Sequence, residues 1–232
     1  MRVIILGALF FSIACSPQMT LAPQPNLTQS SNVQVLIAKD LPKRFVTAVR
    51  SMRSVLAETC LKLREDRNCD FVISVNLDPM SPPNAFQTVD EEGRPLLLFS
   101  ITLIDDMKNV DEIAFVIGHE GAHHILGHLE HQKKSAAGGA TLFEVLAAAL
   151  GGSTQSVGVA SDIGAAVGAR NYSKNYELEA DQLGAQMTLS GGFDPVIGAA
   201  YFTRIPDPGN KFLGTHPPNR DRIAAVRTAV GR

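Results

Sequence analysis

The chain has 232 residues, of which 45% are hydrophobic and 19% are charged. This composition suits one globular domain with a sizeable core and excludes a disordered chain. The formal net charge is −2 and there is no strongly basic block, which argues against nucleic acid as a partner.

The first residues predict export from the cytoplasm. Met1 and Arg2 precede the short, uncharged and mostly apolar run 3–14, which Cys15 follows. This order is typical of a secretory signal, and the run is too short to cross a bilayer as a helix. The segment FSIAC (11–15) resembles a bacterial lipoprotein signal. We therefore expect a signal peptide over 1–14 and lipid on Cys15, with ordinary secretion as the alternative.

Export also fixes the expected compartment. Residues 15–34 are rich in Ser, Pro, Gln and Asn, which predicts a flexible tether before one folded domain over 35–232. Ser16 after the lipid-bearing Cys15 favours an outer-membrane anchor in the periplasm. In that oxidising compartment Cys60 and Cys69, nine positions apart, could form a disulfide, and two unpaired buried thiols are the alternative.

The next stretch predicts one helix and a small sheet. Apolar residues recur at helical spacing over 43–63, and strand patterns follow over 71–77, 85–89 and 96–99. The remainder of the chain reads as mainly helical. We therefore expect an α+β fold with a small antiparallel sheet.

The most regular helix is predicted over 109–134, with Asn109 as its cap and Glu112 completing a capping box. It contains the HExxH motif of His119, Glu120 and His123. At 100° per residue the two histidines lie 40° apart on one face, so both imidazoles can bind one zinc ion. Glu120 flanks that face, where its carboxylate can take a proton from a water acidified by the metal.

A third ligand must come from elsewhere in the chain. The metzincin pattern would need a histidine at the position of Leu129, whereas a glutamate from a later helix is the other common solution. The helix predicted over 173–189 supplies candidates in the segment ELEAD (177–181). The intervening residues 135–170 are rich in Ala, Gly and Ser, and fit a mobile lid, a weakly packed helical pair or, third, a membrane contact. Further helices are predicted over 194–203 and 218–230.

Three motifs follow one another along the chain: HEGAHHILGH (119–128), ELEAD (177–181) and THPPNRDRI (215–223). Together they resemble the HtpX and CAAX-prenyl-protease type of zinc metallopeptidase, and most of all its periplasmic BepA- and LoiP-like branch. The resemblance spans roughly 83–223. It implies a mainly helical, gluzincin-like domain with one zinc ion per chain, bound by His119, His123 and Glu177.

The resemblance also implies supporting roles around the metal. Asp181 would orient a ligand histidine, and His216 would approach the metal, either blocking it or stabilising an oxyanion. Arg222 would hold that segment or bind charge in the site. His128 matches a recurrent family histidine and is a candidate to support a ligand, although on one continuous helix it points away from the metal face, as do His124 and His131.

We therefore expect a zinc-dependent endopeptidase that cleaves unfolded or misassembled envelope proteins. Glu120 would be its general base, and the strand over 85–89 could hold an extended peptide. The alternative is a periplasmic chaperone or assembly factor whose zinc site is closed by His216. A zinc hydrolase acting on other substrates is a third reading.

Overall fold

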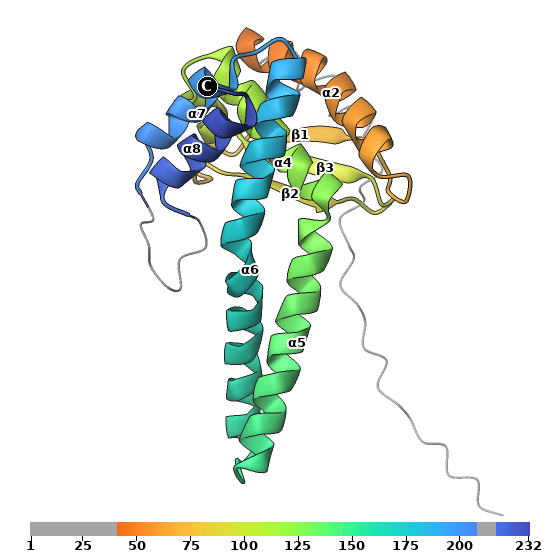
Figure 1. The fold of residues 1–232 in the computed structure, drawn as a ribbon, viewed down its shortest axis with the longest axis vertical. Coiled ribbons are helices and arrows are strands. Elements are labelled where there is room, and N and C mark those ends of the chain that lie inside the picture. Colours follow the sequence, from red (N-terminus) through yellow and green to blue (C-terminus); the bar gives the residue numbers. More distant parts are fainter. Residues whose placement is uncertain (1–40, 208–216) are drawn as a thin grey trace, which may run out of the picture.

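A computed structural model describes residues 41–207 and 217–232, so the predicted signal peptide, Cys15, the tether and His216 lie outside the described residues. The fold is α+β and mainly helical, as predicted. Figure 1 shows a rounded head from which two long helices project side by side. The elements in chain order are α2 (Lys43–Leu63), β1 (Val72–Asn76), β2 (Ala85–Val89), β3 (Pro95–Ser100), α3 (Ile101–Asp106), α4 (Val110–Leu126), α5 (His128–Ala149), α6 (Thr154–Ser190), α7 (Pro195–Ala199), the 3-10 helix η1 (Ala200–Thr203) and α8 (Asn219–Ala229).

The sheet is mixed, which corrects the expectation of an antiparallel one. Its strand order is β1-β3-β2, with β2 antiparallel to β3 and β1 parallel to β3. A tight turn at Gly93 joins β2 and β3 as a hairpin. The segment between β1 and β2 contains Pro79, Pro82 and Pro83, and it is too long for a two-residue hairpin turn. The chain instead crosses to the far side of β3, which leaves β2 at an edge of the sheet.

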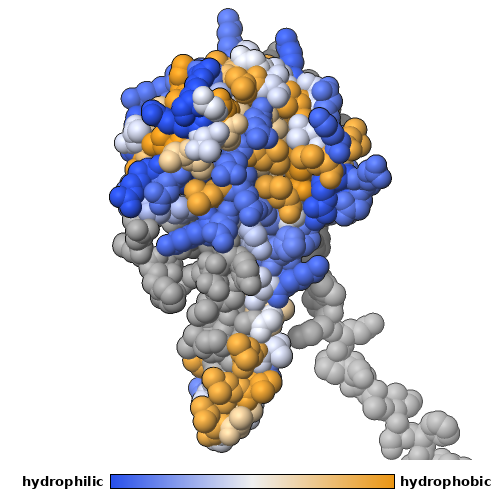
Figure 2. Space-filling model, viewed as in Figure 1, coloured by the Kyte–Doolittle hydropathy of each residue, from blue (hydrophilic) through white to orange (hydrophobic). Residues whose placement is uncertain are grey.

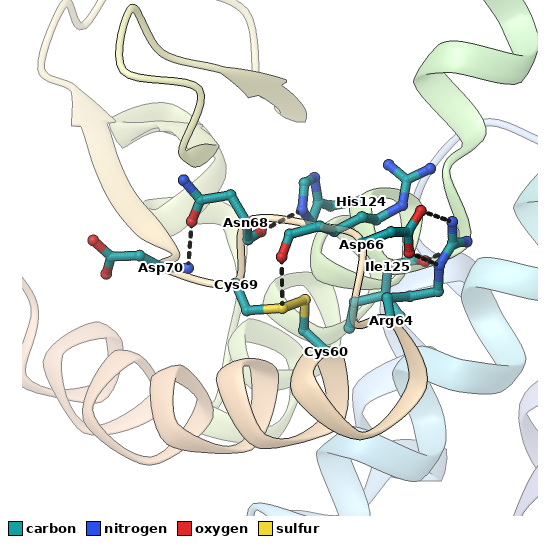
Figure 3. The surroundings of a disulfide bond; sticks show 9 residues. Cys60, Arg64, Asp66, Asn68, Cys69, Asp70, His124 and Ile125 are labelled. Atoms are coloured by element: carbon teal, nitrogen blue, oxygen red, sulfur yellow. Dashed lines mark hydrogen bonds and ion pairs between the residues drawn. A yellow bond between two sulfur atoms is a disulfide. The ribbon is translucent and has the colours of Figure 1, made fainter.

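Helix α2 packs on α4 through residues that are spaced three or four positions apart and therefore lie on one face. Its buried residues are Phe45, Ala48, Met52, Leu56 and Cys60. At the end of α2, Cys60 is joined by a disulfide to Cys69, with the two Cα atoms 5.7 Å apart (Figure 3). The loop that the disulfide closes contacts the end of α4, because the His124 ring bonds to the Asn68 carbonyl oxygen at 2.8 Å. His124 is therefore buried against this loop.

The helix expected over 109–134 is in fact two helices. Gly127 adopts a left-handed conformation (φ 77°) that ends α4 at Leu126, and α5 starts at His128 in a new direction. Glycine adopts this conformation without the penalty that a Cβ imposes. The break changes where every side chain after Gly127 points.

Helices α5 and α6 form a long antiparallel hairpin over the segment that was expected to be a lid, a helical pair or a membrane contact. It is a helical pair, in which α6 begins at Thr154 rather than near residue 173. Its far end exposes several large apolar side chains, visible as the orange patch in Figure 2: Leu142, Val145, Leu146, Leu150 and Val159. Within the described ranges, no helix has the length and apolar character to cross a membrane.

Inside the head, α6 crosses α4 at two glycines. A Cβ on Gly184 would lie 2.8 Å from the His119 nitrogen, and a Cβ on Gly118 would lie 2.8 Å from the Gly184 carbonyl oxygen. The two backbones are therefore in direct contact beside the HExxH motif. Gly121, one turn after Gly118 on α4, allows a second close approach: the Leu56 side chain of α2 fills the space that a Cβ would need.

Candidate metal site

The α4–α6 crossing brings together three side chains of the types that bind metal ions. His119 and His123 lie one turn apart on α4, and their Nε2 atoms are 3.0 Å apart. Glu177 on α6 places one carboxylate oxygen 3.5 Å from Nε2 of His119 and the other 3.4 Å from Nε2 of His123. One ligand atom from each residue lies within 4.8 Å of the other two.

These separations fit one zinc ion. Two nitrogen ligands at about 2.05 Å from a tetrahedral zinc lie about 3.3 Å apart. The separation of the two histidine nitrogens, 3.0 Å, and those from each nitrogen to its nearer Glu177 oxygen, 3.4 and 3.5 Å, lie close to that value. The donor set of two imidazoles and one carboxylate is also that of many catalytic zinc sites, which keep a fourth position open.

Asp181 supports the first histidine from behind. Its carboxylate accepts a hydrogen bond from Nδ1 of His119 at 2.9 Å, which directs Nε2 towards the site. Arg222 of α8 donates two bonds of 2.7 Å to the same carboxylate. Burial disfavours a charged His119, but its bonds to Asp181 and Glu177 outweigh this effect and raise its pKa to about 10. The surroundings of His119 thus favour a positive charge, which a metal ion can supply in place of a proton.

Arg222 is itself held on two sides. Its guanidinium lies 3.9 Å from the centre of the Phe202 ring, a cation–π contact, and one of its nitrogens is 3.4 Å from Glu177. Among the described residues, Arg222 thus contacts both Asp181 and Glu177. His216, the other residue expected from the same C-terminal motif, lies outside the described residues.

His128 does not point away from the site, which corrects the prediction from one continuous helix. The turn at Gly127 directs its ring back to His123, and the Nδ1 atoms of the two rings are 3.0 Å apart. Burial and the neighbouring His123 lower the pKa of His128 to about 3, so its ring is neutral. On its other side the ring reaches Glu179, the second glutamate of the ELEAD segment, at 3.2 Å.

The side chains of His119, His123 and Glu177 open into a cleft of about 740 Å³. Glu120, the predicted general base, also lines this cleft. The lining further includes residues 83–87, which lead into and form the start of edge strand β2. The cleft thus combines the candidate metal ligands, a further carboxylate and the edge of a sheet.

Some residues of the site could not be found from sequence patterns. Tyr176 stacks on His128, with ring centres 4.4 Å apart and planes at 15°. Arg204, which also lines the cleft, makes a bidentate ion pair with the buried Glu112 at 2.6 and 2.7 Å. The capping box signalled Glu112, but no motif signals its distant partner.

A pair of histidines one turn apart with a glutamate from a later helix is the ligand arrangement typical of zinc metallopeptidases. Residues 50–230 match the sequence model of Peptidase family M48. The match covers well over half of the chain, and the protein belongs to this family of metallopeptidases. A comparison with curated protein sequences gives no significant match.

Proposed function

We propose that this protein is a zinc-dependent endopeptidase with His119, His123 and Glu177 as its metal ligands. The observation that carries the proposal is the meeting of these three side chains at zinc-like separations in the wall of an open cleft. Glu120 is the proposed general base, and Asp181 with Arg222 fixes the orientation of His119.

A zinc ion bound there would acidify a water molecule and polarise the carbonyl group of the scissile bond. The carboxylate of Glu120 would accept the proton of the attacking water and then pass it to the leaving amine. Glu120 lies one residue from His119 and lines the same cleft, so both tasks are within its reach. The proposed ligand Glu177 is held in place by the backbone contact of α4 and α6.

The proposed substrate is a polypeptide in an extended conformation. Strand β2 is an edge of the three-stranded sheet, and its first residues line the cleft. An extended peptide can pair with such an edge through main-chain bonds, which requires an unfolded segment. This favours unfolded or misassembled proteins over folded ones as substrates.

The proposed location follows from the sequence. The signal-like residues 1–14 and Cys15 favour a lipid-anchored protein of the periplasm, with the residue after Cys15 favouring the outer membrane. Envelope proteins would then be the substrates. The resemblance of the three motifs also favours the BepA- and LoiP-like branch of the family.

The test uses purified protein, an unfolded model substrate and metal analysis. Wild type should contain one zinc ion and cleave the substrate. Glu120→Gln should retain zinc while its turnover falls by about 10²–10⁴-fold, because only the proton carrier is lost. Glu177→Gln should lose zinc, whereas Glu179→Gln should keep it.

Two outcomes would overturn the proposal. Retention of zinc by Glu177→Gln at wild-type affinity would remove Glu177 from the ligand set. Equal binding of the unfolded protein by wild type and Glu120→Gln, with no cleavage by either, would instead indicate a chaperone or assembly factor.

A further inference from the structure

His128 is almost fully buried, at 2% exposure, although it is outside the proposed ligand set. Both of its ring nitrogens have partners. Nδ1 lies 3.0 Å from Nδ1 of His123, and Nε2 lies 3.2 Å from a carboxylate oxygen of Glu179. The face of the ring stacks on Tyr176. A buried ring held on both edges and on one face has a fixed position.

The direction of the hydrogen bonds follows from His123. Its Nε2 faces His119 and Glu177, so that this nitrogen is the one available to a metal. A neutral imidazole that binds a metal through Nε2 carries its proton on Nδ1. Nδ1 of His123 therefore donates to His128, whose own proton is then on Nε2 and is donated to Glu179.

We propose that His128 and Glu179 are positioning residues, which hold the ring of His123 in the orientation that presents Nε2 to the metal. The inference rests on the proposed function, in which that metal is zinc. The two ligand histidines are thus supported in different ways. Asp181 contacts His119 directly, whereas Glu179 acts on His123 through an intervening imidazole.

The burial of the two carboxylates predicts unequal contributions. The side chain of Asp181 is completely buried, while that of Glu179 is 55% exposed and its charge is screened by water. Most of the support for His123 should therefore come from the buried ring of His128. Loss of a group that orients a ligand histidine costs about 10–100-fold in metal affinity.

The experiment measures the zinc dissociation constant by competition with a chelator, together with the absorption spectrum of the cobalt-substituted protein. His128→Phe keeps a flat ring against Tyr176 but removes both hydrogen bonds, and should weaken zinc binding by about 10–100-fold. Glu179→Ala should weaken it less, by at most about tenfold. Glu179→Gln should restore wild-type affinity, because the amide oxygen can accept the same bond.

The matched control is His131→Phe. His131 is a neighbouring histidine that also lies against Tyr176, with ring centres 6.0 Å apart, but it is exposed and outside the hydrogen-bonded chain. Its zinc affinity should equal that of wild type. The combination of His128→Phe with Glu179→Ala should bind zinc no more weakly than His128→Phe alone, because the two residues act in series.

A purely structural role for His128 would lower the melting temperature of the metal-free protein and leave the zinc affinity and cobalt spectrum unchanged, which would overturn the inference. Wild-type affinity in His128→Phe with wild-type stability would overturn it as well. If these shifts are found but wild type cleaves no peptide, the proposed endopeptidase activity fails while the positioning role stands.

Discussion

The close approach of α4 and α6 provides the sharpest test of how this fold builds its metal site. In Gly184→Ala the added methyl group would lie 2.8 Å from the His119 nitrogen and 3.1 Å from the Gly118 carbonyl carbon, both backbone atoms that cannot rotate away. Ordinary contact begins at 3.4 Å, so the two helices must separate by about 0.6 Å. Metal sites hold their ligands within about 0.2 Å of the ideal distances.

Two energies oppose each other in Gly184→Ala. Alanine is a better helix former than glycine by about 1 kcal/mol, whereas forcing an extra methyl into a packed core costs about 1–3 kcal/mol. The difference is a net loss of at most about 2 kcal/mol in the metal-free protein, which lowers the melting temperature by at most about 8 °C. Zinc affinity should fall at least tenfold, because His119 moves away from Glu177 with its helix.

Gly158→Ala is the matched control in the same helix. No atom lies within 4 Å of the position of its added Cβ, so the helix should gain stability with no effect on zinc binding. Differential scanning calorimetry of the metal-free proteins and chelator competition give the two quantities. The reasoning is refuted if the two alanine variants have the same melting temperature and the same zinc affinity.

Three further predictions concern the surroundings of the site. Replacing Cys60 and Cys69 by alanine should cost about 2.5–3 kcal/mol, seen as a melting temperature lower by about 5–12 °C, and a reductant should destabilise wild type but not this variant. Arg222→Met should lower the free energy of unfolding, measured in urea, by about 3–5 kcal/mol, because the carboxylate of Asp181 is left buried without its cation. Arg222→Lys should recover part of this loss. Equal stability of the two variants would contradict the reasoning. In wild type, a chelator should remove zinc and lower the melting temperature by about 8–16 °C, if free zinc had been about 1,000-fold above its dissociation constant. The melting temperature of Glu177→Gln should not change when the chelator is added.

The sequence predicts those parts of the site whose residues lie close together in the chain better than those that combine distant segments. His119 and His123 lie on one uninterrupted helix, so helical spacing alone predicts that they converge. The choice of Glu177 over Glu179 came from resemblance to a family, since both glutamates belong to one short segment. Their contacts in the structure agree with the 200° that separates them on the helix, with Glu177 near the histidines and Glu179 at His128.

The sequence pattern misleads where one backbone angle decides the outcome. Treating residues 109–134 as one helix directed His128 away from the metal face, and the left-handed turn at Gly127 reverses that direction. Gly121 is another residue whose place in α4 the sequence does not explain. Its function depends on Leu56 of a distant helix, which no local pattern reveals.

The hairpin of α5 and α6 occupies the chain between the histidine ligands and the glutamate. The two helices leave the head together, pack against each other and are joined at their far end. Adding the same number of whole turns to each would therefore extend the arm by about 5.4 Å per turn without moving either base. The number of residues between HExxH and the glutamate is therefore set by the length of an arm and not by the chemistry at its root. A motif search for related enzymes should leave that interval unrestricted.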